Sequence, residues 1–101
     1  KEYTHQRSEI IKERSRATKP LKTQIKKNEN RIIESEALVE QANELLIKAS
    51  EEDDGEGVFK YSKQLSSNEK KIEELFFELE ELSEKLNLIE SEYEVKLNEL
   101  N

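Results

Sequence analysis

Residues 61–100, YSKQLSSNEKKIEELFFELEELSEKLNLIESEYEVKLNEL, decide the fold. Large apolar side chains recur there at spacings of three and four residues, at Tyr61, Leu65, Ile72, Leu75, Leu79, Leu82, Leu86, Ile89, Tyr93 and Leu100. Asn68 and Lys96 fill the two gaps in this pattern. Because a period of 3.5 residues keeps one stripe of a helix against a partner helix, the spacing predicts a coiled-coil seam.

A weaker seam precedes it, at Leu21, Ile25, Asn28, Ile32, Ser35, Val39, Ala42, Leu46 and Ala49. Between the two seams, residues 50–57 (SEEDDGEG) contain two Gly and a run of acids, which predicts a break in the helix. Seam positions then match across the break with residue numbers that sum to about 107, as in Leu46 with Tyr61. The sequence therefore predicts an all-α fold, an antiparallel two-helix coiled-coil hairpin.

The expected boundaries are a helix over 20–50, a tip over 51–57 and a helix over 58–100, together a hairpin domain over 20–101. Two starts are open for the second helix. A capping box of Ser66 and Glu69 would leave a longer loop, whereas Val58 and Tyr61 keep the period and favour the earlier start.

Residues 1–19 form a basic helical lead-in or linker with few apolar side chains. Pro20 lacks a backbone N–H and crowds the carbonyl of Arg16, so either a kink or a fresh helix start is expected there. In the second case Thr18 would cap the new helix.

The composition limits the class of protein. Hydrophobic residues make up 33 % and charged residues 41 % of the chain, too few apolar side chains for a wide core but enough for a narrow seam. Disorder is the rival interpretation, and the sustained period argues against it. The absence of Cys removes disulfides and thiolate sites, and no apolar run of ~18 residues could span a membrane. We expect a cytoplasmic protein without membrane contact, and the initial Lys suggests a piece of a longer chain.

The net charge of −7 is unevenly distributed. Residues 1–31 hold ten Lys and Arg against four Glu, whereas residues 32–101 hold seven Lys against twenty Asp and Glu. A basic end that meets a polyanion would explain this asymmetry, and so would charge complementarity between the two ends of a hairpin. Both explanations stay open.

No motif in the chain indicates catalysis. Glycine-rich phosphate loops are absent, and the single His5 has no partner at ligand spacing. The acids around Gly55 lack the spacing of a calcium loop. We expect no catalytic residue, no metal and no cofactor in this chain.

The basic residues are the candidate binding surface, because helical spacing gathers them where phosphates could be neutralised. A merely solvated basic face is the alternative. No base-reading element is evident, so we expect weak sequence specificity. The candidate nucleic-acid-binding residues are Lys12, Arg14, Arg16, Lys19, Lys22, Lys26 and Lys27.

The order of basic segment, Thr18-Lys19-Pro20-Leu21-Lys22, heptad helix, acidic tip and second heptad helix resembles the C-terminal domain of ABC-F proteins of the Uup/YheS type. Tyr61 matches the Tyr that follows the tip in that family, and Tyr93 matches its late aromatic residue. The family's Asp-Pro at the tip is replaced here by residues 53–57, DDGEG.

The resemblance implies that the parent protein has two ATP-binding cassettes, hydrolyses ATP with magnesium and acts on ribosomes or translation. It also implies that the hairpin is an accessory arm that contacts DNA, RNA or the ribosome and lies beside the parent's own cassettes.

Two other functions stay open. One is a structural or protein-interaction coiled coil, such as a spacer or dimerisation arm, and the other is the nucleic-acid-binding arm of a tRNA-handling enzyme. Self-association through the seam is left open as well. Phe77 lies off the seam. It is either a contact for the N-terminal segment, which we favour, or a partner site.

Overall fold

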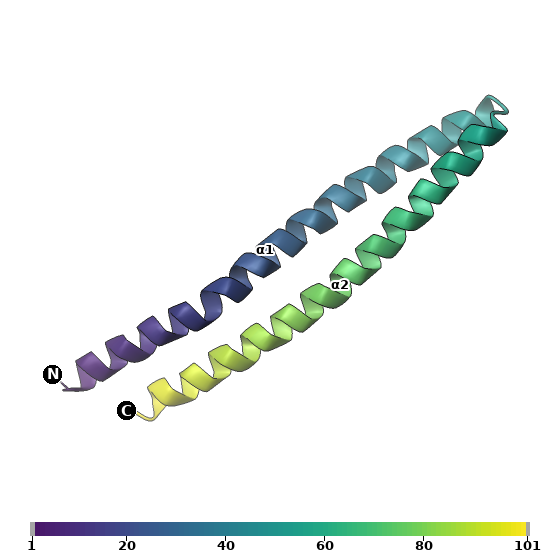
Figure 1. Ribbon diagram of the computed structural model, residues 1–101. Helices are drawn as coiled ribbons and strands as arrows, with labels where there is room; N and C mark the ends of the chain where they lie inside the picture. Colours follow the sequence, from purple (N-terminus) through teal and green to yellow (C-terminus); the bar gives the residue numbers. More distant parts are fainter. Residues whose placement is uncertain (1, 101) are drawn as a thin grey trace. The chain divides into compact units, whose positions relative to one another are not determined.

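The computed structural model describes residues 2–100. It contains two helices, α1 (Glu2–Glu51) and α2 (Gly55–Asn98), which Figure 1 shows running antiparallel from the turn that joins them. The described part of the chain has no strand. The predicted all-α helical hairpin is confirmed.

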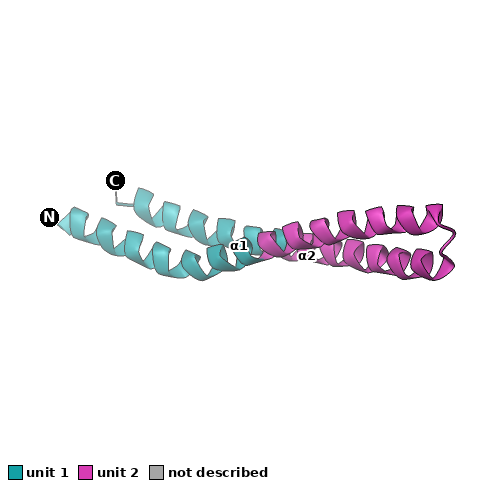
Figure 2. Cartoon of the chain, turned by 90° about the horizontal axis from the view of Figure 1, so that it is seen from above, with its two compact units in different colours: residues 1–27, 79–101 teal, residues 28–78 magenta. Residues whose placement is uncertain are grey.

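Two compact units make up the hairpin (Figure 2). Unit 1 contains residues 1–27 and 79–101, and unit 2 contains residues 28–78. Each unit therefore pairs a segment of α1 with a segment of α2. The candidate nucleic-acid-binding residues all lie in the α1 segment of unit 1.

Residues before and after Pro20 belong to the same helix. α1 continues through Pro20 instead of restarting there, so the basic lead-in is helical but is not a separate element. Thr18 is not a cap: its hydroxyl donates to the carbonyl of Arg14, 2.8 Å away, one turn back within α1. Pro20 removes one backbone hydrogen bond of α1, and its ring crowds the carbonyl of Arg16.

The first seam is built from small residues on one side. Four positions seven residues apart in α1 are among the least exposed in unit 2: Asn28 (5 %), Ser35 (2 %), Ala42 (3 %) and Ala49 (4 %). Short side chains let a facing helix approach closely, and a Cβ added at Gly57 of α2 would lie 3.0 Å from the Cβ of Ala49. Large side chains of α2 complete the packing, with Leu75 only 6 % exposed.

Asn28 is a polar member of this row. Its side-chain amide donates to Oε2 of Glu78 at 3.2 Å, a pairing that matches the predicted register. Its carbonyl oxygen is buried without a hydrogen-bond partner among the described residues. Polar groups in a coiled-coil seam specify register at a cost in stability, and Asn28 fits that role.

The second seam shifts by one residue near its end. The heptad pattern predicts Lys96 at a seam position, but Leu97 is the buried residue, at 8 % exposure. Lys96 is exposed, with its Nζ 4.7 Å from the centre of the Tyr93 ring. An α-helix has 3.6 residues per turn, so a 3.5-residue pattern drifts unless the helices supercoil to compensate.

The turn between the helices is shorter than predicted. α1 ends in a Schellman-type cap, with the N–H of Asp54 bonded to the carbonyl of Ala49 (2.9 Å) and that of Asp53 to Ser50 (3.3 Å). Asp53 takes the left-handed conformation at φ 55°. Asp54 then caps α2, because its Oδ1 accepts from the N–H of Gly57 at 3.0 Å.

The predicted boundaries at the tip are therefore corrected. Between α1 and α2 only residues 52–54 lie outside the helices, and both glycines belong to the first turn of α2 with negative φ. The early start of the second helix is right, but it lies three residues before the predicted residue 58. Ser66 and Glu69 lie inside α2 and form no helix start.

Candidate nucleic-acid interface

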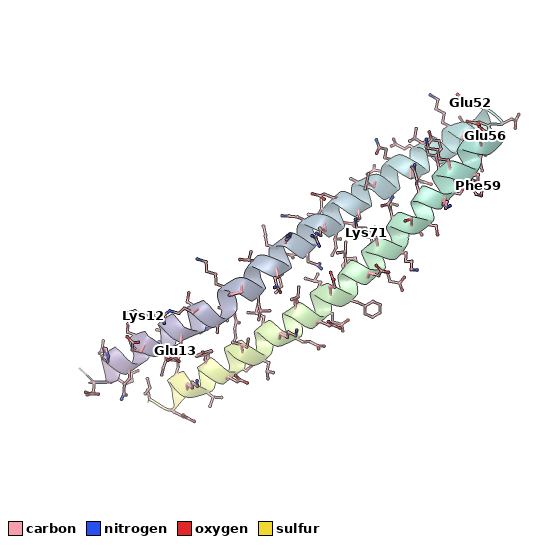
Figure 3. All side chains as sticks on the ribbon, viewed as in Figure 1. Lys12, Glu13, Glu52, Glu56, Phe59 and Lys71 are labelled. Carbon is pink, nitrogen blue, oxygen red and sulfur yellow. The ribbon has the colours of Figure 1, made fainter. Side chains whose placement is uncertain are left out.

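Six of the seven candidate residues share one side of α1. At 3.6 residues per turn they spread over an arc of about 140°. All six are exposed, and Figure 3 labels Lys12, the first of them, on α1. We call this set the basic face: Lys12, Arg16, Lys19, Lys22, Lys26 and Lys27.

Arg14 does not belong to the basic face. It lies about half a helical turn round from Lys12, which places it on the seam side of α1. Arg14 is partly buried and lines a shallow cavity of about 380 Å³ together with Glu90 and Glu94 of α2. Two carboxylates at this cavity suit an arginine that stays within the hairpin.

Two of the six cations on the basic face have acidic neighbours. Nζ of Lys22 lies 3.7 Å from Oε1 of Glu90 on α2, and Nζ of Lys12 lies 3.8 Å from Oε1 of Glu9 on α1. Both lysine side chains are 60 % exposed, so solvent screens these pairs and they hold the lysines only weakly.

The other four cations of the basic face form no ion pair with the described residues: Arg16, Lys19, Lys26 and Lys27. The two explanations of the charge asymmetry thus both have a structural basis. Lys22 and Glu90 make a complementary contact between the helices, while four cations face solvent.

The two helices of unit 1 carry opposite charge. Residues 1–27 hold nine Lys and Arg against three Glu, whereas residues 79–101 hold two Lys against seven Glu. A polyanion is therefore attracted to the α1 side of unit 1 and repelled by its α2 side. Within unit 1, the charges therefore favour a polyanion on the α1 side only.

α2 carries a second basic region, which the sequence analysis does not predict. Residues 59–71 of α2 hold four Lys against one acid, Glu69, and begin with Phe59, which is 70 % exposed. The net charge summed over residues 32–101 is strongly negative and hides this region. The net charge summed over shorter segments would reveal it.

Other expectations concern single residues. Phe77 is 64 % exposed, so most of its side chain is uncovered. Among residues 2–100, no three His, Cys, Asp or Glu side chains are grouped so that they could hold a metal ion. Neither described helix has a stretch apolar enough to cross a membrane.

Comparison of the chain with protein-family models, with curated proteins and with solved structures finds no match.

Proposed function

We propose that this hairpin is an accessory arm that contacts nucleic acid through the basic face of α1. The observation that supports the proposal is the gathering of six exposed cations on one side of a single helix, four of them without an acidic partner among residues 2–100. Lysine and arginine side chains so placed neutralise phosphates and release counterions.

The chemistry of the face favours contact with the backbone of a nucleic acid. Lys and Arg are the charged groups of this face. Side-chain amides of Asn and Gln can read a base edge, because they carry a donor and an acceptor side by side, and Gln24 is the one such residue between Lys12 and Lys27. Phosphate contacts position a protein without reading sequence. Binding in this proposal is salt-dependent and nearly independent of sequence.

The parent in this proposal is an ABC-F ATPase, on the strength of the resemblance in residues 18–22 and in the order of the segments. ATP and magnesium would bind to cassettes outside this chain, and the ribosome is the corresponding large partner. Two Walker motifs encoded upstream of residue 1 would support this parentage, whereas heptads continuing upstream would contradict it.

A structural or protein-interaction arm is the second candidate. The contact between Lys22 and Glu90 favours it, because an ion pair between the two helices needs no external partner. In that case replacing the residues of the basic face would change the stability of the hairpin, and the unaltered chain would not bind nucleic acid.

The test compares the chain with a variant in which Lys12, Arg16, Lys19, Lys26 and Lys27 are all changed to Glu. Binding to duplex DNA, structured RNA and ribosomes is measured across a salt series. Lys22 is kept so that its contact with Glu90 is preserved. We expect binding that weakens steeply with salt and is lost in the variant. No binding of the unaltered chain to any of the three near physiological salt would refute the proposal.

A further inference from the structure

The outer side of α2 in unit 2 carries a row of two lysines with a phenylalanine at each end. Phe59, Lys63, Lys70 and Phe77 follow at steps of four, seven and seven residues, so they lie within about 40° of one another around the helix. Phe59 is 70 % and Phe77 64 % exposed, and both lysines are exposed. No packing within the hairpin accounts for this row.

Phe59 also borders a shallow groove. The groove has a volume of about 490 Å³ and is lined by residues that span about half the circumference of α2: Phe59, Lys60, Lys63, Gln64, Ser67 and Asn68. Figure 3 labels Phe59 on α2 close to the turn. We call this hollow the Phe59 groove. One wall is an aromatic ring, and the others carry ammonium, amide and hydroxyl groups.

Most of these polar groups are free to act on a ligand. Lys60 and Lys63 form no ion pair with the described residues, although Nζ of Lys60 lies 5.6 Å from the centre of the Tyr61 ring. Gln64 and Ser67 make no side-chain hydrogen bond within the described chain. The amide nitrogen of Asn68, by contrast, already donates to the carbonyl of Gln64 at 2.9 Å.

Charge favours an anionic ligand at this place. The segment 59–71 holds four Lys against one Glu, within a unit that is otherwise rich in acids. An exposed ring beside unpaired lysines is the combination that binds single-stranded nucleic acid, since bases stack on the ring and phosphates meet the ammonium groups. Duplex bases are already stacked on one another and cannot use the ring.

We propose that the Phe59 groove binds an unpaired nucleotide of single-stranded nucleic acid. The base stacks on Phe59, the flanking phosphates contact Lys60 and Lys63, and Gln64 and Ser67 donate to the base edge or the sugar. Lys70 and Phe77 extend the track along α2. This binding site goes beyond the proposed function, because it lies in the other unit and uses bases instead of the backbone alone.

The experiment measures binding of the whole chain to three fluorescent probes: a twelve-nucleotide uridine strand, an abasic strand with the same phosphates, and a duplex of equal length. Phe59→Ala tests the ring, and Phe76→Ala is its matched control, because Phe76 is also exposed (50 %) but lies about 100° round the helix. Lys63→Gln tests the phosphate contact, with Lys85→Gln as control.

We expect Phe59→Ala to weaken binding of the uridine strand about fivefold or more, since stacking contributes about 1–3 kcal/mol per base. Binding of the abasic strand and the duplex should not change, and Phe76→Ala should behave like the unaltered chain. Lys63→Gln should reduce the salt dependence of strand binding by about 0.7 in logarithmic slope.

Equal effects of Phe59→Ala and Phe76→Ala, or an equal loss on the abasic strand, would overturn this inference, as would absence of binding to the uridine strand at 50 mM salt. A separate measurement shows whether the basic face binds nucleic acid. The five-residue Glu variant of α1 should lose duplex binding while the difference between the uridine and abasic strands persists. Loss of duplex binding therefore tests the basic face and not the Phe59 groove.

Discussion

Gly57 and Gly55 lie two residues apart in the first turn of α2, yet a side chain would meet different surroundings at each. A Cβ at Gly57 would clash with the carboxylate of Asp54 and lie 3.0 Å from the Cβ of Ala49, whereas a Cβ at Gly55 would have nothing within 4 Å. We expect Gly57→Ala to lower the free energy of unfolding by about 1–3 kcal/mol through overpacking. Gly55→Ala should raise it by about 0.4–1 kcal/mol, because Ala restricts the unfolded chain.

Urea unfolding followed by circular dichroism measures both glycine variants. Equal stability of the two would contradict the close approach of α1 and α2 at the turn.

Substitutions at Asp53 and Asp54 should have opposite effects on stability. Asp54 caps α2 through Oδ1, so Asp54→Ala should cost about 0.5–2 kcal/mol of stability. Asp53 holds φ at 55°, which glycine adopts without strain, so Asp53→Gly should stabilise the hairpin. Thermal unfolding of the two variants measures whether the melting temperature falls in Asp54→Ala and rises in Asp53→Gly. A stabilising Asp54→Ala would show that the cap contributes nothing.

At the scale of the elements, the small residues of α1 decide how closely α2 packs. Ala42 is 3 % exposed, whereas Ala37 on the same helix is exposed. Ala42→Leu should cost about 1–3 kcal/mol, because the added methylenes have no space in the seam. Ala37→Leu should be near neutral. Urea midpoints compare the two, and equal midpoints would mean that the seam is loosely packed.

Pro20 lies inside α1, where it removes a backbone hydrogen bond. Pro20→Ala would restore the bond to the carbonyl of Arg16 and should stabilise the hairpin by an amount of the order of 1–3 kcal/mol. Differential scanning calorimetry measures the change. A lower melting temperature in the variant would instead show that the turn at Pro20 is needed for α1 to pack on α2.

The elements that were predictable are those whose signal repeats. Heptad spacing predicts the two paired helices and their register, though not their ends, because every turn adds the same information. Single residues carry no such redundancy. The two glycines predict the break, whereas the left-handed residue is Asp53 and the cap is Asp54. Pro20 indicated a boundary, but packing along both sides of it outweighed its local cost.

At the scale of the whole molecule, charge per segment was more informative than total charge. Six of the seven candidate residues share the basic face, as helical spacing predicted. Arg14 does not, because the i, i+2 step from Lys12 turns it to the opposite side of the helix. The Phe59 groove escaped prediction since it depends on which side chains the hairpin leaves exposed.

The most direct test of the basic face is the salt dependence of duplex binding by two single variants. Lys19 lies on that face without an ion pair among the described residues, while Lys85 lies on the acidic α2 side of unit 1. Lys19→Gln should reduce the slope of log K against log salt by about 0.9, the loss of one phosphate contact, and Lys85→Gln should leave it unchanged. The same slope for both variants would contradict nucleic-acid contact through the basic face of α1.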